Sequence, residues 1–179
     1  MKILITGVSG TGKSTICKNL INLGYEASDI ENIKGMFEMY HKDTKAVFEE
    51  FDNSIPHHIK SAEWICDIGK LKKLVESKKS GIAFYCGVAS NMDDLIPLFD
   101  KVIVLQPDPD VLNVRLKNRE GTDDIGNNQN GRDVILGWKD WWEKEMHKKG
   151  GILVNANASS QETTEKILDI LNLPHKALK

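Results

Sequence analysis

The sequence predicts an α/β fold in which a parallel β-sheet is covered by helices on both faces, giving three layers. Strand-like and helix-like segments alternate along the 179 residues, which is typical of parallel sheets built from βα units. Residues 82–86 are apolar throughout, as expected of a central strand that is buried on both faces. A glycine-rich turn directly follows the first strand-like run, and such folds bind ligands at the carboxyl ends of their strands.

Periodicity and turn residues place the elements in order. The strands are short runs between turn signals, and we expect them at residues 2–6, 25–29, 82–86, 101–105 and 152–154. The helices carry apolar side chains every three or four positions, and we expect them at residues 13–23, 67–77, 91–99, 109–119, 132–148 and 160–171. Residues 32–51 have aromatic side chains at helical spacing, which predicts mixed helix, and Pro56 with His57 and His58 marks a break.

Composition is that of one soluble globular domain spanning residues 1–179. Hydrophobic residues make up 40% and charged residues 28% of the chain, both ordinary values. The net charge of -2 gives no broad positive field for nucleic acid or an anionic membrane. No apolar run has membrane-spanning length, and the first strand begins too early for a signal peptide. Cys17, Cys66 and Cys86 lack metal-type spacing and indicate buried thiols in a reducing compartment, so we expect a cytoplasmic protein.

The turn after the first strand is the most specific motif. Residues 7–15 read Gly-Val-Ser-Gly-Thr-Gly-Lys-Ser-Thr and match G-x-x-x-x-G-K-[ST], a loop whose backbone N–H groups cradle phosphates. Lys13 would reach the terminal phosphates of ATP and Ser14 would ligate Mg²⁺. The alternative is a chance match in an ordinary strand-to-helix turn. The residues expected to contact the nucleotide here are Gly7, Ser9, Gly10, Thr11, Gly12, Lys13, Ser14 and Thr15.

Two carboxylates follow the second strand. Asp29 and Glu31 would face the phosphate-binding loop, where one would help to hold Mg²⁺ and the other would accept a proton from an attacking hydroxyl. Asp29 is the preferred metal and catalytic candidate. The alternatives are that Asp29 caps a following helix and that Glu31 belongs to its first turn.

All the arginines lie in one part of the sequence. The chain has 24 Lys and Arg residues, of which only Arg115, Arg119 and Arg132 are arginines, and all three flank a Gly/Asn/Asp-rich segment. Guanidinium groups suit the charge that spreads during phosphoryl transfer, so we expect a lid that closes over the nucleotide. The alternative is surface pairing with nearby acids, which contributes little.

Other polar positions are less specific. No acid ends the third strand, which argues against a motor-type ATPase. Ser90 and Asn91 would bind a ligand or cap a helix, and Asn157, after the last strand, is placed near the nucleotide base. Among the remaining residues, Asp67 is most simply a helix cap. Trp138, Trp141 and Trp142 are at helical spacing and indicate core or hinge packing rather than a stacking surface.

With these features together, the chain resembles the small phosphate-loop kinases, a group that includes adenylate kinase-like, shikimate kinase-like and gluconate kinase-like enzymes. Residues 7–14 look most like the gluconate kinase loop. The resemblance implies a five-stranded parallel sheet in the order 2-3-1-4-5, an acceptor-binding segment around residues 30–60 and a lid around residues 120–131. It also implies ATP with Mg²⁺, an acidic site at Asp29 and a lid motif at Arg115 and Arg119.

The resemblance implies a kinase that moves the γ-phosphoryl group of ATP to a hydroxyl of a small molecule. No arginine precedes Arg115, so the acceptor is not expected to be a nucleoside monophosphate or shikimate. The acceptor segment offers lysine and histidine instead, namely Lys34, His41, Lys42, His57, His58 and Lys60. Two alternatives stay open: a regulatory nucleotide-binding ATPase with slow hydrolysis, and a nucleic-acid end kinase, which the mild acidity disfavours.

Overall fold

Five parallel strands form the central sheet of the protein. The computed structural model describes residues 1–78, 81–118, 125–126 and 128–175. The strands are β1 (Lys2–Thr6), β2 (Glu26–Asp29), β5 (Ala83–Cys86), β6 (Lys101–Gln106) and β7 (Ile152–Asn155). Their spatial order is β2-β5-β1-β6-β7, and every neighbouring pair is parallel. The predicted order, in which the third strand of the sheet lies between the second and the first, is confirmed.

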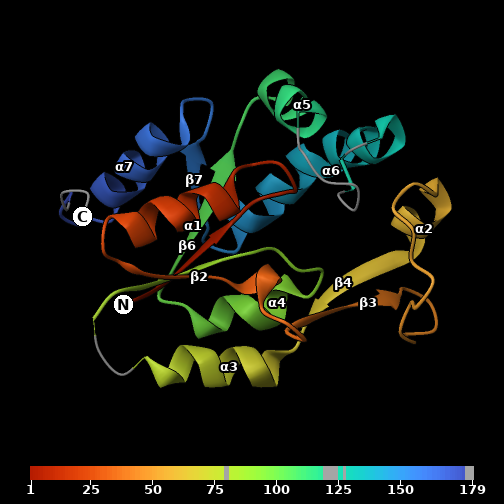
Figure 1. The fold of residues 1–179 in the computed structure, drawn as a ribbon, viewed down its shortest axis with the longest axis horizontal. Coiled ribbons are helices and arrows are strands. Elements are labelled where there is room, and N and C mark those ends of the chain that lie inside the picture. The colour runs from red at the N-terminus through yellow and green to blue at the C-terminus, as the bar shows by residue number, and fades with distance from the viewer. Residues whose placement is uncertain (79–80, 119–124, 127, 176–179) are drawn as a thin grey trace.

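Helices cover both faces of this sheet (Figure 1). They are α1 (Lys13–Asn22), α3 (Ile68–Ser77), α4 (Met92–Leu95), α5 (Pro109–Lys117), α6 (Gln129–Lys148) and α7 (Ser160–Ile170). On one face α1 and α7 bury Ile16 and Ile167 in a cluster with Ile5 of β1. On the other face α3, α4 and α6 pack in a cluster that contains Leu4 of the same strand. Alternate side chains of β1 thus enter opposite layers, as strand geometry requires.

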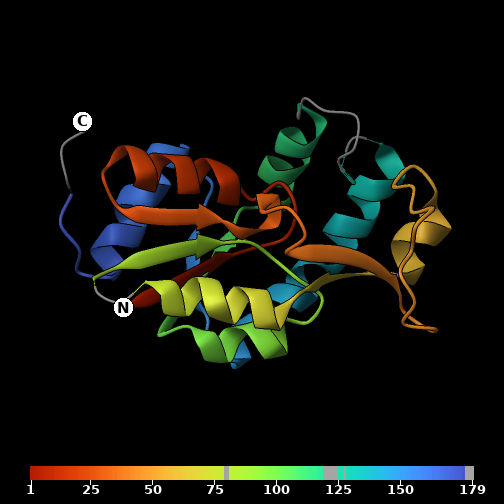
Figure 2. The ribbon, with the colours of Figure 1, turned by 60° about the horizontal axis from the view of Figure 1, so that its bottom comes forward.

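A two-stranded antiparallel hairpin lies outside the main sheet (Figure 2). It consists of β3 (Phe37–His41) and β4 (Ala62–Cys66), with Phe37 opposite Cys66 and Met39 opposite Trp64. The short helix α2 (Pro56–Ser61) lies within its connection. The predictions of mixed helix over residues 32–51 and of a break at His57 and His58 are therefore wrong.

Strand pairing explains the error. Phe37, Met39 and His41 lie on one face of β3 because successive side chains of a strand alternate. The helical prediction rests on a different spacing, such as that of Phe37 and Tyr40, which are three residues apart. The ring of Trp64 stacks on Phe37 with a centroid distance of 5.2 Å. Cross-strand pairing between distant segments, which a local pattern does not contain, selects the hairpin.

Helix α6 contains a buried ion pair, and one partner of this pair is hydrogen-bonded to the end of β6. Lys139 and Glu143 are 3% and 2% exposed, and the Lys139 Nζ lies 2.9 Å from the Glu143 Oε1. Gln106, the last residue of β6, donates from its Nε2 to the Glu143 Oε2 at 2.9 Å. A buried charge is tolerated when it is paired and hydrogen-bonded. The contact holds α6, and with it Trp138 and Trp141, in one position beside the sheet.

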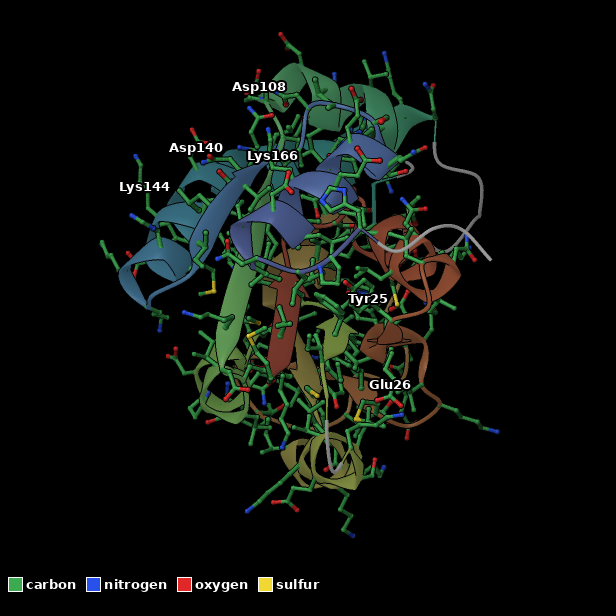
Figure 3. All side chains as sticks on the ribbon, turned by 90° about the vertical axis from the view of Figure 1, so that its left-hand side faces the viewer. Tyr25, Glu26, Asp108, Asp140, Lys144 and Lys166 are labelled. Carbon is green, nitrogen blue, oxygen red and sulfur yellow. The ribbon has the colours of Figure 1, made fainter. Side chains whose placement is uncertain are left out.

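The amino ends of the parallel strands lie at the edge of the sheet that is opposite to their carboxyl ends (Figure 3). There the Tyr25 hydroxyl donates to the Pro174 carbonyl at 2.5 Å, which attaches the segment after α7 to the start of β2.

The predicted buried thiols are confirmed, since Cys17, Cys66 and Cys86 are all buried and free. Burial raises the pKa of the Cys66 thiol to about 12. None of the helices in the described ranges combines the length and the apolar composition needed to cross a bilayer.

Candidate functional site

A cavity of about 860 Å³ opens at the carboxyl edge of the sheet. The phosphate-binding loop forms its floor, and the hairpin and α6 form its walls, through Met39, Trp64 and Trp138. Glu31 and Asn32, from the 3₁₀ turn η1 (Ile30–Asn32), face the loop from the end of β2. The volume is within the usual range for a small-molecule site.

The loop has the backbone conformation that phosphate binding needs. Gly10 and Gly12 have φ angles of 86° and 101°, a region that residues with a Cβ rarely adopt. A Cβ at Gly10 would lie 2.6 Å from Leu116 Cδ2, whereas one at Gly12 would meet nothing within 4 Å. Gly12 is the N-cap of α1, and no side chain caps this helix end. The first-turn N–H groups of α1 thus face the cavity as an anion site.

Every loop residue from Ser9 to Thr15 lines the cavity, while Gly7 does not. Gly7 acts through its carbonyl oxygen, which accepts a hydrogen bond from the Lys13 Nζ at 2.9 Å. Thr11 closes the turn, since its hydroxyl donates to the Val8 carbonyl at 2.9 Å. Lys13 is only 8% exposed. The loop therefore presents one nearly buried ammonium group, with the Ser14 hydroxyl beside it in the same cavity.

Glu31 is the carboxylate that the structure brings to the loop. Its Oε1 lies 3.5 Å from the Lys13 Nζ and accepts a hydrogen bond from the Val88 N–H at 3.1 Å. Gly87 permits this contact, because a Cβ there would lie 2.5 Å from Ile30 Cγ1. Glu31 thus connects the loop, the end of β2 and the turn after β5.

Asp29 lies at the end of β2 but does not line the cavity. Its Oδ2 accepts a hydrogen bond from the Asn32 Nδ2 at 2.8 Å. It precedes η1 as the N-cap residue without a side-chain cap bond. Of the two predicted acids, Glu31 therefore has the more direct geometry for contact with a ligand.

The predicted lid arginines have different surroundings. Arg115 lines the cavity, and its Nη2 donates to the Ala158 carbonyl at 2.9 Å. Burial lowers the pKa of this guanidinium, which still stays charged at neutral pH. Arg132, in the first turns of α6, is 8% exposed and donates from its Nη1 to the Gly126 carbonyl at 3.1 Å. Arg119 and most of the expected lid, residues 120–124 and 127, lie outside the described residues.

Asn157 and the turn after β5 serve as connectors between elements. The Asn157 Oδ1 accepts from the Asp108 N–H at 2.6 Å, and Asn157 does not line the cavity. The Asn91 side chain bonds both the N–H and the carbonyl of Cys66, at 3.0 and 3.1 Å. The Ser90 Oγ accepts from the Trp64 N–H at 2.9 Å. Ser90 and Asn91 therefore attach the hairpin to the main sheet rather than cap α4.

Sequence reasoning missed the apolar wall of the cavity, which is formed by Met39, Phe51, Trp64 and Trp138. The expectation that the tryptophans of α6 pack in a core or a hinge is wrong for two of them. Trp142 is 5% exposed, but Trp138 is 41% and Trp141 61% exposed. The available signal was the spacing of Val134, Trp138, Trp142 and Met146, a continuous apolar stripe on one helix face.

A second cavity of about 670 Å³ adjoins the first and shares part of its wall. Of the predicted acceptor-binding groups, only Lys42 and Lys60 reach a cavity, and it is this second one. The His41 ring stacks on Phe48 with a centroid distance of 3.7 Å. The His58 Nδ1 accepts a hydrogen bond from the Asp52 N–H at 3.1 Å. These two histidines stabilise the loop between β3 and β4 instead.

Solved structures with this fold include several kinases. Deoxyadenosine kinase from M. mycoides, with products dCMP and dCDP bound, has a TM-score of 0.58 at 19% identity and covers 96% of this chain and 99% of its own. A sugar kinase from Janibacter sp. HTCC2649 has a TM-score of 0.53 at 19% identity over 96% of this chain and 94% of its own. Shikimate kinase from Bacteroides thetaiotaomicron has a TM-score of 0.50 at 16% identity and covers 97% of this chain and 99% of its own. These likenesses show the fold.

Sequence comparison gives one curated relative and one family. The relative is the adenylate kinase isoenzyme 6 homolog of Plasmodium falciparum, which is 31% identical over 127 residues. The alignment covers 67% of this chain and 66% of that protein, just under two thirds of the relative's length. A family model described as an AAA domain matches residues 3–137, well over half of the chain. The chain therefore belongs to this AAA domain family, and it has the fold of the small phosphate-loop kinases.

Proposed function

We propose that the protein is an ATP-dependent phosphotransferase that moves the γ-phosphoryl group of ATP to a hydroxyl of a small molecule. The observation that carries the proposal is the contact between Lys13 and Glu31, whose charged groups lie 3.5 Å apart in the lining of one cavity. This contact puts a phosphate-binding ammonium group and a proton-accepting carboxylate side by side at the space where transfer would occur. The kinase names of the curated relative and of the structural neighbours support the same reaction class.

The donor half consists of the phosphate-binding loop. The N–H groups of the loop and of the first turn of α1 would hold the phosphates, and Lys13 would neutralise the β- and γ-phosphate oxygens. The Ser14 hydroxyl would ligate Mg²⁺, with Asp29 as a partner through water, and the bound ion would neutralise charge that develops on the phosphates. The described residues contain no cluster of three or more His, Cys, Asp and Glu that would hold a metal alone. This donor set fits Mg²⁺, which uses few protein ligands together with substrate phosphates.

The acceptor half supplies a base. Glu31 would orient the acceptor hydroxyl and take its proton while the hydroxyl oxygen forms a bond to the γ-phosphorus. The bond between that phosphorus and the bridging oxygen breaks at the same time, and ADP leaves. Arg115, with Arg119 and Arg132 of the expected lid, would stabilise the charge on the transferring group. Asn157 would contribute near the nucleotide base through its backbone.

The charges of the cavity support a proposal for the class of acceptor. Arg115 is the sole arginine among the described residues that line it, on the donor side. Among the described residues, the acceptor side therefore has no guanidinium group to grip a phosphate, which favours an uncharged hydroxyl compound over a nucleoside monophosphate. The three buried thiols favour a cytoplasmic protein.

The test is an ADP-release screen over sugars, nucleosides, nucleotides and small acids, with wild type and Lys13→Ala. We expect at least one acceptor to stimulate ADP release, and Lys13→Ala to abolish it. Lys18→Ala is the matched control, because Lys18 lies exposed on the same helix and should leave turnover intact. Unchanged turnover in Lys13→Ala would overturn the mechanism.

Two other outcomes would point to the alternative functions. Tight nucleotide binding with no acceptor that stimulates ADP formation would indicate a regulatory nucleotide-binding protein. A salt-sensitive affinity for oligonucleotides would indicate a nucleic-acid end kinase.

A further inference from the structure

The second cavity is a continuation of the proposed acceptor site. It shares Met39, Phe51, Trp64, Ile125 and Trp138 with the first cavity. The phosphate-binding loop lines only the first. A molecule whose hydroxyl faces Glu31 can therefore extend past the shared wall into the second cavity, away from the nucleotide phosphates.

Several aromatic side chains line this extension, and one of them, Trp64, is held in place. Phe37 stacks on Trp64 at an interplanar angle of 19°. Both backbone polar groups of Trp64 are bonded by Ser90, whose N–H donates to the Trp64 carbonyl at 2.7 Å and whose Oγ accepts from the Trp64 N–H. The position of Trp64 is thus fixed before any ligand binds, which reduces the entropic cost of binding.

The opposite wall comes from α6, where Trp138 lies one turn from Trp142 and beside Trp141. Trp138 and Trp141 keep 41% and 61% of their surface exposed, although the same helix buries Trp142 in the core. The Glu143 carboxylate, which pairs with Lys139 on the same helix, accepts a hydrogen bond from Gln106 at the end of β6 and so attaches this part of α6 to the sheet. Large exposed aromatic surface that is rigidly held and rimmed by polar groups is typical of a ligand-binding groove.

The charges around the second cavity balance. Lys42, Lys60 and Lys149 are matched by Glu63, Asp93 and Glu145. Most of these groups are already engaged: Lys149 pairs with Asp93, Glu63 pairs with Lys45, and the Lys42 Nζ donates to the Lys60 carbonyl at 2.7 Å. Neither of the two described arginines lines this cavity. The walls therefore favour a flat apolar group over a phosphate or a carboxylate.

We infer that the acceptor is an uncharged alcohol that carries an aromatic ring, bound with the ring between Trp64 and Trp138 and the hydroxyl toward Glu31. This inference rests on the proposed phosphotransfer and narrows its substrate class. The ring supplies binding energy by stacking, since each stacked base or ring contributes appreciably to affinity. The hydroxyl supplies the reacting oxygen.

The experiment compares alcohols that differ in the ring. Adenosine, thymidine and pyridoxine are the ring-bearing probes, and ribose, glucose and glycerol are the ring-free probes; adenosine and ribose share the same sugar. We expect a ring-bearing probe to stimulate ADP release, with kcat/KM at least about tenfold above that of ribose, from the contribution of one stacked ring. Trp138→Ala should raise its KM about tenfold, more than it changes kcat.

Two further variants separate ring recognition from a structural effect. Trp138→Phe keeps a stacking ring, so its KM should lie close to the wild-type value. Ile170→Ala removes an exposed apolar side chain on α7 that lines neither cavity and should leave KM unchanged. Equilibrium binding of each probe, followed by calorimetry in the presence of a non-hydrolysable ATP analogue, gives a readout that does not need turnover.

The outcomes distinguish this inference from the proposed function. If ribose supports turnover as well as adenosine and Trp138→Ala has no effect, phosphotransfer stands and the inference is overturned. If no probe releases ADP but ring-bearing probes bind and Trp138→Ala weakens that binding about tenfold, ring recognition stands and phosphotransfer falls. If no ring-bearing probe binds or reacts, the inference is overturned.

Discussion

At the scale of single residues, Glu31 connects the phosphate-binding loop with the turn after β5. Its carboxylate contacts the Lys13 ammonium group of the loop and accepts the Val88 N–H from the turn after β5. A carboxylate held by a backbone N–H has a fixed direction, which a proton acceptor needs. The same contacts also stabilise the structure around Glu31. Its role as a proton acceptor therefore has to be tested with a variant that keeps the hydrogen bond.

Glu31→Gln is that variant. The amide oxygen of glutamine still accepts the Val88 N–H, whereas the amide cannot take a proton from an acceptor. We expect kcat to fall by about 10²- to 10⁴-fold, the usual contribution of a general base, while nucleotide affinity changes far less. Both are measured by ADP release and by equilibrium binding of a nucleotide.

Asp29→Asn is the comparison for Glu31→Gln. Asp29 bonds Asn32 and does not line the cavity, so we expect a smaller loss of kcat and a higher requirement for Mg²⁺. A larger loss in Asp29→Asn than in Glu31→Gln would reverse the two assignments.

At the scale of secondary-structure elements, α3 depends on its cap. The Asp67 side chain accepts from the Lys70 N–H at 2.9 Å, and this bond is the main cause of the lowered pKa of Asp67. Because the pKa is lower in the folded protein than in the unfolded chain, the contribution of the charged cap is complete above the unfolded value, about 4. It is lost as the pH falls through the folded value.

We therefore expect Asp67→Ala to lower the melting temperature by about 2–4 °C at pH 7. The difference from wild type should shrink below about pH 4, where the carboxylate of the wild type becomes protonated. Calorimetric scans from pH 7 to pH 3 measure both effects. A difference that stays constant across this range would contradict a charged cap.

The strands of the main sheet and the helices that cover it were predictable because each sequence signal for them is local. An apolar run such as residues 82–86 or a cap at Asp67 is contained in a few neighbouring residues. The hairpin was not predictable in this way. Its strands pair across the loop and α2, so the pairing depends on residues far apart in the sequence.

The same difference between local and long-range signals explains which parts of the site were predicted from the sequence. The phosphate-binding loop was predicted from one motif, and Asp29 and Glu31 were predicted from their positions after a strand, with Asp29 preferred. Trp64 and Trp138 were missed, because they come from separate elements that meet only in the folded chain. The tryptophan spacing on α6 indicated a buried face, and it did not reveal that the face continues into a cavity.

At the scale of the whole molecule, the two halves of the cavity have different origins. The donor half is formed by α1 and by the loop that follows β1 of the main sheet. The acceptor half is formed by Glu31 after β2, the hairpin, the segment that connects its strands, and α6. Substitutions in the hairpin and on α6 should therefore change the acceptor without disturbing the loop that holds the nucleotide.

The hairpin also has a consequence for local stability. Its two strands form a sheet of their own and do not pair with the main sheet, so it can open without breaking any ladder of the main sheet. We expect amide hydrogens of β3 and β4 to exchange with solvent through local opening, orders of magnitude faster than those of β1, β5 and β6, which need global unfolding. Hydrogen exchange followed by mass spectrometry measures this, and equal protection in both sheets would contradict it. A ligand between Trp64 and Trp138 would slow exchange in the hairpin far more than in the central strands.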